Sequence, residues 1–173
     1  MTDDELFMGE ALAEARLAAG EGEVPVGAVA VCNGRIIARA RNRVEACKDA
    51  TCHAEVELLK QCAAVRGDWR MEDVEIFVTK EPCAMCAGAM VNSRVRRVVF
   101  GLPDPRSGCC GSALDITGFS GMLWQVEVSG GVRSEECMAL MKSFFRMFCF
   151  LPLMVNANCS LSAGIITFVE SIS

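Results

Sequence analysis

A strand–helix–strand alternation in the middle of the chain constrains the fold more than any other sequence feature. Residues 74–79 and 95–100 are rich in β-branched and aromatic side chains, and both are predicted to be buried strands. A helix is predicted between them, over residues 83–92. Strands joined by a helix in this way form a right-handed crossover, which makes them parallel and places the helix on one face of the sheet. The pattern therefore predicts an α/β fold.

The first part of the chain supplies an antiparallel pair of strands. Residues 24–31 are almost wholly apolar, as in a strand that is buried on both faces. Asn33-Gly34 follows and is a strong hairpin signal, so a second strand is predicted over residues 35–42. The sheet is therefore expected to begin with a hairpin before the parallel crossovers follow.

Helices are expected on both faces of a sheet of five strands. The fifth strand is predicted over residues 125–128, and helices are predicted to begin near residues 3, 53, 83 and 134. The helices that begin at 53 and 83 should start at the same edge of the sheet, where ligand sites of open α/β sheets gather. Residues thirty positions apart in the sequence can meet there.

Composition predicts one globular domain followed by a tail. The 173 residues suffice for a domain with a sizeable core, and no apolar span approaches the roughly 20 residues that cross a membrane. An acidic start without a basic leader and eleven cysteines predict a cytoplasmic protein with reduced thiols. Residues 148–173 carry one charge, Glu170, so we expect a domain over residues 1–147 and an apolar C-terminal tail of unknown role over residues 148–173.

Three potential metal ligands occur in two short motifs. His53 is the only histidine, and Cys83 and Cys86 are spaced so that both sulfurs can lie on one side at the start of a helix. Three such ligands would hold one zinc ion per subunit and leave its fourth position to water, as in catalytic sites. Taken singly, a C-x-x-C pair also fits a redox site or half of a structural zinc site, and a lone histidine is more often packed than liganded.

The two motifs together, His-Ala-Glu followed by Pro-Cys-x-x-Cys, match the signature of zinc-dependent base deaminases. Glu55 is predicted not to be a ligand, because residues two apart on a helix point about 200° from one another. Its expected role is to carry protons from the zinc-activated water to the ring nitrogen and the departing amine.

The wider sequence resembles the bacterial TadA-type tRNA adenosine deaminases, within the cytidine deaminase-like superfamily. The resemblance extends through about residue 147, and its most specific segments are GEVPVGA at 22–28, HAE at 53–55, TKEPCAMCAGA at 79–89 and RVVFG at 97–101. It implies a three-layer α/β/α fold with a mixed five-stranded sheet. It also implies a homodimer with one zinc per subunit, held by His53, Cys83 and Cys86.

The resemblance further implies hydrolytic deamination of adenosine to inosine at the wobble position of a tRNA anticodon. In such an enzyme Asn42, Val26, Ala28 and Ala54 would contact the target nucleoside, and Asp104 would lie near the RNA backbone. The expected partner is an anticodon stem-loop, because an unpaired base can be swung into a pocket.

Other functions remain open from the sequence. The net charge of −5 does not itself predict a nucleic-acid binder, and Lys80 stands where the family commonly has an apolar residue. A free nucleobase or nucleoside deaminase of the guanine or cytidine type would share the zinc core. A catalytically silent RNA-binding subunit with structural zinc would not need Glu55, so this carboxylate favours an enzyme.

Overall fold

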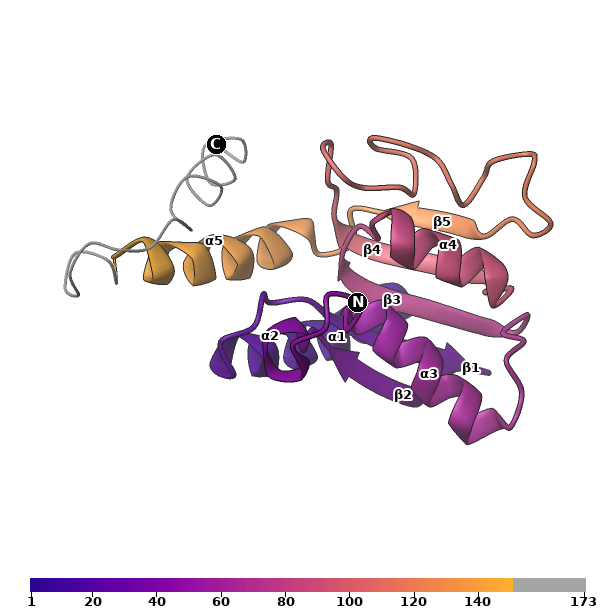
Figure 1. Ribbon diagram of the computed structural model, residues 1–173, viewed down its shortest axis with the longest axis horizontal. Coiled ribbons are helices and arrows are strands. Elements are labelled where there is room, and N and C mark those ends of the chain that lie inside the picture. Colours follow the sequence, from indigo (N-terminus) through magenta and orange to yellow (C-terminus); the bar gives the residue numbers. More distant parts are fainter. Residues whose placement is uncertain (151–173) are drawn as a thin grey trace.

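A mixed five-stranded sheet between two layers of helices forms the body of the protein (Figure 1). The computed structural model describes residues 1–150, with the side chains of residues 148–150 excluded, so the predicted tail lies outside the described residues from residue 151 onward. The strands run in the order β2-β1-β3-β4-β5 across the sheet. This arrangement confirms the predicted three-layer α/β/α architecture.

The sheet contains both antiparallel and parallel strand pairs, as the sequence predicts. β1 (Gly27–Cys32) pairs antiparallel with both β2 (Arg35–Arg41) and β3 (Val74–Lys80), whereas β3, β4 (Arg97–Leu102) and β5 (Glu127–Gly130) are parallel. Asn33 and Gly34 both have positive φ, 50° and 73°, which is the backbone of the primed turn that closes a two-residue hairpin. The predicted hairpin is confirmed.

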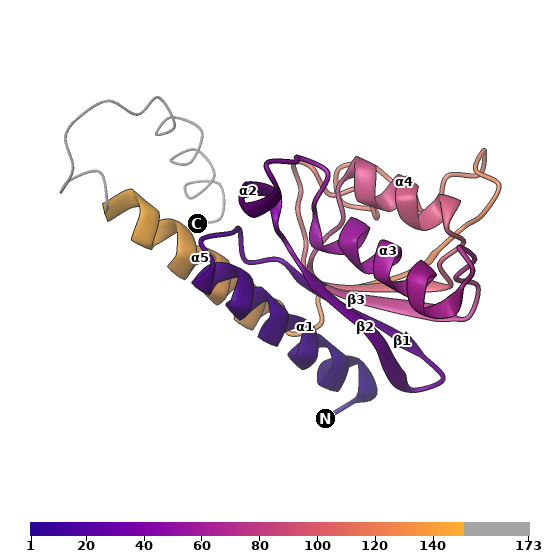
Figure 2. The same ribbon diagram turned by 60° about the horizontal axis from the view of Figure 1, so that its bottom comes forward.

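Helices cover both faces of the sheet (Figure 2). α1 (Asp3–Gly20) and α5 (Ser134–Phe150) lie on one face, and α3 (Ala54–Arg66) and α4 (Ala84–Asn92) lie on the other. β3 serves both cores: Phe77 packs with Met8 and Leu12 of α1, while its neighbours Ile76 and Val78 pack with Leu58 of α3 and Met90 of α4. Burial on both faces explains why this strand is so continuously apolar.

Three strands begin later than the apolar pattern predicts. β1 starts at Gly27 rather than residue 24, because Pro25 has no N–H to donate to a neighbouring strand. Gly27 itself brings the strand against α1, since a Cβ there would lie 2.3 Å from the Ala11 carbonyl oxygen. β4 and β5 each start two residues after their predicted positions, because Val95 and Val126 are buried in the core without being part of a strand.

One short helix, α2 (Val44–Cys47), lies between β2 and α3 and is not among the elements predicted from the sequence. None of the helices within residues 1–150 combines the length and apolar character that a membrane crossing requires.

Candidate metal centre and active-site pocket

The predicted metal ligands come from the N-terminal ends of α3 and α4, which begin at the same edge of the sheet (Figure 1). His53 is the N-cap of α3 and Cys83 is the N-cap of α4, so both have extended backbone conformations and precede the helical residues. Cys86 lies one turn into α4 and faces the same point. Helix dipoles contribute positive potential at this point, which favours thiolates.

The three ligand atoms have the spacing of a tetrahedral zinc site. His53 Nδ1 lies 3.7 Å from Cys83 Sγ and 3.5 Å from Cys86 Sγ, and the two sulfurs are 3.7 Å apart. Zinc with ordinary bond lengths and tetrahedral angles requires about 3.8 Å between two sulfurs and about 3.6 Å between sulfur and nitrogen. The group therefore fits one zinc ion per subunit, and the structure brings the three predicted ligands together.

The charges of the ligands also suit a cation. Hydrogen bonds with Cys86 and His53 lower the pKa of the Cys83 thiol to about 3, and Cys83 in turn raises the pKa of the His53 imidazole. The neighbouring Cys83 and burial together raise the pKa of Cys86 strongly. Two thiolates side by side need a positive charge between them. A divalent ion supplies this charge and, as it binds, displaces the proton of the second thiol.

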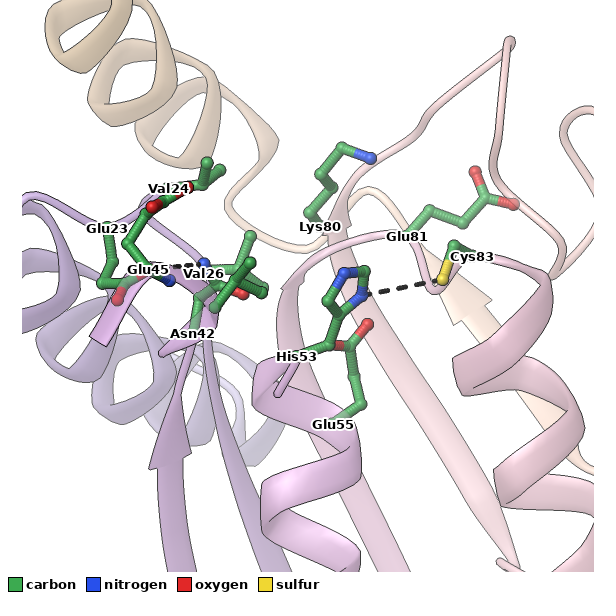
Figure 3. A pocket seen from close by; sticks show the side chains of 11 residues that line it. Glu23, Val24, Val26, Asn42, Glu45, His53, Glu55, Lys80, Glu81 and Cys83 are labelled. Atoms are coloured by element: carbon green, nitrogen blue, oxygen red, sulfur yellow. Dashed lines mark hydrogen bonds between the residues drawn. The ribbon is translucent and has the colours of Figure 1, made fainter. Parts of the chain in front are cut away.

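Glu55 lies beside this group without belonging to it. Its carboxylate is not among the three atoms that converge, yet it lines the same pocket as His53 and Cys83 (Figure 3). The angle of about 200° predicted between His53 and Glu55 is wrong, because it assumes that both residues are helical, whereas His53 is the N-cap with an extended backbone. Glu55 is only 4% exposed, and burial raises the pKa of its carboxyl group.

The pocket is a cavity of about 270 Å³ that opens beside the metal ligands. Its size lies just below the range of about 300–1,000 Å³ that is usual for small-molecule sites, so it suits a group the size of a single nucleobase. Val26 and Asn42 form one wall, with His53 between them and Cys83 (Figure 3). Of the residues the sequence singled out, Val26, Asn42, His53, Glu55 and Cys83 line this pocket.

Two other predicted contacts, Ala28 and Ala54, lie in the core between the sheet and the helices α3 and α4. Both are fully buried, and neither is among the residues that line the pocket in the described part of the chain. Ala54 is the first helical residue of α3, so its N–H is one of those without a partner inside the helix.

A glutamate that the sequence did not single out fixes the orientation of Asn42. Glu23 is 1% exposed, and its carboxylate accepts hydrogen bonds from Asn42 Nδ2 at 3.1 Å and from the N–H groups of Glu45 and Ala46. Because a carboxylate only accepts, the amide nitrogen of Asn42 must face Glu23. The carbonyl oxygen of Asn42 is thus left to accept a hydrogen bond in the pocket.

A second unpredicted glutamate anchors the loop after β4. Glu81 is 2% exposed, and its carboxylate accepts the N–H groups of Asp104, Cys110 and Ser112 at 2.8, 3.1 and 3.1 Å. Gly108 approaches so closely that a Cβ would lie 2.3 Å from this carboxylate. Glu81 also lines the pocket, so the loop is tied directly to its wall.

Asp104, predicted to lie near RNA, points inward within this loop. Its carboxylate accepts hydrogen bonds from Lys80 Nζ, from the Ser107 hydroxyl and from the N–H of Arg106. Although burial acts in the opposite direction, Lys80 and Ser107 lower the pKa of Asp104 well below its usual range. Asp104 borders the site through Lys80, which lines the pocket.

Fold and site together define the class of the protein. A cytidine deaminase-like sandwich that brings one imidazole and two cysteine sulfurs together beside a base-sized pocket lined by a buried glutamate is the arrangement of zinc-dependent deaminases. The family model described as the cytidine and deoxycytidylate deaminase zinc-binding region matches residues 1–102.

Relatives specify the family within this class. The tRNA-specific adenosine deaminase of Bacillus subtilis is 47% identical over 146 residues, covering 84% of this chain and 91% of the relative. That of Agrobacterium fabrum is 37% identical over 140 residues, covering 81% of this chain and 92% of the relative. The chain belongs to the tRNA-specific adenosine deaminase family.

Solved structures agree with this assignment. A structure from work on A-to-I editing by tRNA:A34 deaminases at the wobble position superimposes with a TM-score of 0.75 and 36% identity, covering 78% of this chain and 97% of that chain. A guanine deaminase from Nitrosomonas europaea superimposes with a TM-score of 0.71 over 81% of this chain and 83% of that chain. At 22% identity, the second likeness shows the fold alone.

Proposed function

We propose that this protein hydrolyses adenosine to inosine and ammonia at the wobble position of a tRNA anticodon. The observation that carries the proposal is the convergence of His53, Cys83 and Cys86 on one point beside the buried Glu55. The relatives named tRNA-specific adenosine deaminase supply the substrate class.

His53, Cys83 and Cys86 would hold the zinc ion, whose contribution is to make water a nucleophile near neutral pH. Glu55 accepts the proton that the attacking water loses, because its carboxylate shares the pocket with the ligands. Glu55 passes this first proton to the ring nitrogen as the C–O bond forms. It then takes the remaining proton from the new hydroxyl group and passes it to the amine, so that the C–N bond breaks and ammonia leaves. Burial keeps competing water away from this proton transfer.

Asn42 and Val26 orient the base in this proposal. The carbonyl oxygen of Asn42 accepts a hydrogen bond from the nucleoside, and Val26 provides an apolar wall. Ala54 offers the N–H at the start of α3, and Ala28 supports the base pocket from within the core. Asp104 orders the loop that would face the RNA backbone.

The adenosine must be unpaired to reach this pocket, so we propose an anticodon stem-loop as the partner. The test is inosine formation on such a hairpin by the zinc-loaded protein, with free adenosine, guanine and cytidine as alternative substrates. Inosine on the hairpin with little turnover of the free compounds supports the proposal. Equal or faster turnover of a free base contradicts it and favours a free nucleobase deaminase.

We also propose that the protein acts as a homodimer in the cytoplasm, with residues 1–147 as the deaminase domain. Supporting the dimer, the connection between β4 and β5 exposes four large apolar side chains: Leu114 at 60%, Phe119 at 58%, Met122 at 40% and Leu123 at 104%. Several exposed large apolar side chains within one connection support an interface there. Sedimentation of the purified protein as a monomer would contradict the proposed dimer.

A further inference from the structure

Among the described residues, Lys80 is the only lysine or arginine that lines the pocket. It is the last residue of β3, and its side chain is 19% exposed. Figure 3 shows it beyond the His53 ring, with its ammonium group extending away from that ring. The ammonium therefore lies apart from the metal ligands while still facing the pocket.

Asp104 holds this ammonium group in place. Lys80 Nζ donates a hydrogen bond to Asp104 Oδ2, and the Asp104 side chain is only 6% exposed. The same carboxylate is fixed by the hydroxyl and N–H of Ser107 and by the N–H of Arg106, so it cannot swing away easily. An ammonium group has three N–H bonds, and across residues 1–150 Asp104 is its one hydrogen-bond acceptor. Two donors remain for a ligand.

The other charged side chains that line the pocket, apart from the metal ligands, are acidic. Four glutamates line it, namely Glu23, Glu45, Glu55 and Glu81. A nucleotide whose base reaches Glu55 has its sugar and phosphate toward the opening, so its phosphate must pass this negative wall. A lysine at that position offers a point charge of the kind that binds phosphate oxygens.

We propose that Lys80 is a specificity-determining residue that binds a phosphate group flanking the target nucleoside. This inference rests on the proposed deaminase function and adds to it. The contact selects phosphate-bearing nucleotides over free nucleosides, and Asp104 acts through Lys80 as a positioning residue.

The first test compares Lys80→Met with the wild-type protein and with Lys60→Met. Methionine keeps the length of the side chain without its charge, and Lys60 is an exposed lysine on α3 that pairs with Glu57. For a protein bound to single-stranded RNA, the loss of one contact to a phosphate should make the slope of log(kcat/KM) against log salt shallower by about 0.7. Between about 50 and 200 mM salt, kcat/KM of the wild type should thus fall about 2.6-fold more than that of Lys80→Met.

We expect this change to appear in KM, with kcat and zinc content unchanged. The melting temperature should fall in Lys80→Met, because the nearly buried Asp104 carboxylate loses its cationic partner. Lys60→Met should keep the wild-type slope, and Lys80→Arg should largely restore it. A fall in kcat at an unchanged salt slope would overturn the inference, because it would assign Lys80 to the chemistry or to loop order instead.

The second test changes the substrate and leaves the protein intact. Hairpins with one uncharged methylphosphonate on either side of the target adenosine should show, for one of the two positions, the same loss of salt slope in the wild type. That substitution should have no further effect on Lys80→Met. Adenosine 5′-monophosphate and adenosine as competing inhibitors distinguish a 5′-phosphate contact from a 3′ one, because only a 5′ contact makes the monophosphate bind more tightly.

If neither methylphosphonate alters the wild-type slope, Lys80 does not contact a flanking phosphate and the inference fails, whatever the stability of the variants. In that case inosine formation by the wild type still supports the proposed function. If the wild type forms no inosine on any anticodon hairpin, both the function and the inference fall.

Discussion

Replacing Glu81 should loosen the loop that borders the pocket, by an amount that the hydrogen bonds of its carboxylate define. One oxygen of Glu81 accepts the N–H of Asp104, and the other accepts the N–H groups of Cys110 and Ser112. In Glu81→Gln the amide oxygen can keep the last two, but the amide nitrogen then faces the Asp104 N–H, donor against donor. An unsatisfied buried N–H costs about 1–3 kcal/mol.

The alanine variant should cost more. Asp104 and Cys110 are buried and lose their only carboxylate acceptor, whereas Ser112 is exposed and can turn to water. Two buried groups at about 1–3 kcal/mol each predict a loss of about 2–6 kcal/mol for Glu81→Ala. For a chain of this size, a loss of about 2 kcal/mol in the glutamine variant corresponds to a decrease in Tm of about 4–8 °C.

Thermal unfolding and amide hydrogen exchange of the zinc-loaded protein test this prediction. Exchange should accelerate first at residues 104, 110 and 112, because their N–H groups lose the common acceptor. Glu72→Gln is the matched control: Glu72 pairs with Arg94 on the surface, so its replacement should change stability by less than about 0.5 kcal/mol. Unchanged protection of the three amides in Glu81→Ala would refute the anchoring role of Glu81.

Three further variants separate metal binding, proton transfer and substrate orientation. Cys86→Ser should lower zinc content measured by atomic emission and abolish turnover, since one of three ligands is lost. Glu55→Gln should keep its zinc but lose at least about 10²-fold in kcat, and normal kcat would exclude the proton-carrier role. Glu23→Leu should raise KM for the hairpin through Asn42, whose amide loses its fixed partner, while leaving zinc content unchanged; an unaltered KM would contradict the orienting role.

The parts of the fold that were predictable carry strong local signals. Asn33-Gly34 encodes its turn in two residues, because both adopt positive φ that few other residue pairs tolerate. Strand starts were less predictable, since Val95 is buried against the core before β4 begins and its apolar side chain looks the same in either state. Helix α2 has no recognisable start signal in its own sequence. Its first N–H groups, those of Glu45 and Ala46, donate hydrogen bonds to Glu23, which lies more than twenty residues earlier in the chain.

Some residues of the candidate site were likewise predictable from the sequence, and others were not. His53, Cys83 and Cys86 were predictable because metal ligands need particular side chains at particular spacings. Glu23 and Glu81 were not, because their partners are mostly backbone N–H groups more than twenty residues away. Nearly every residue carries such a group, so only the folded chain shows which ones meet.

His53 and Cys83 occupy the N-cap positions of α3 and α4. At these positions the residue that best binds metal is not the residue that best stabilises the helix. Neither side chain caps its helix, because each directs its ligand atom toward the common point instead. Serine or aspartate at such a position would cap the helix and gain about 0.5–2 kcal/mol. A substitution that improved helix capping at either position would therefore raise stability and remove a metal ligand. The two poorly capping residues have a physical reason in metal binding and none in helix stability.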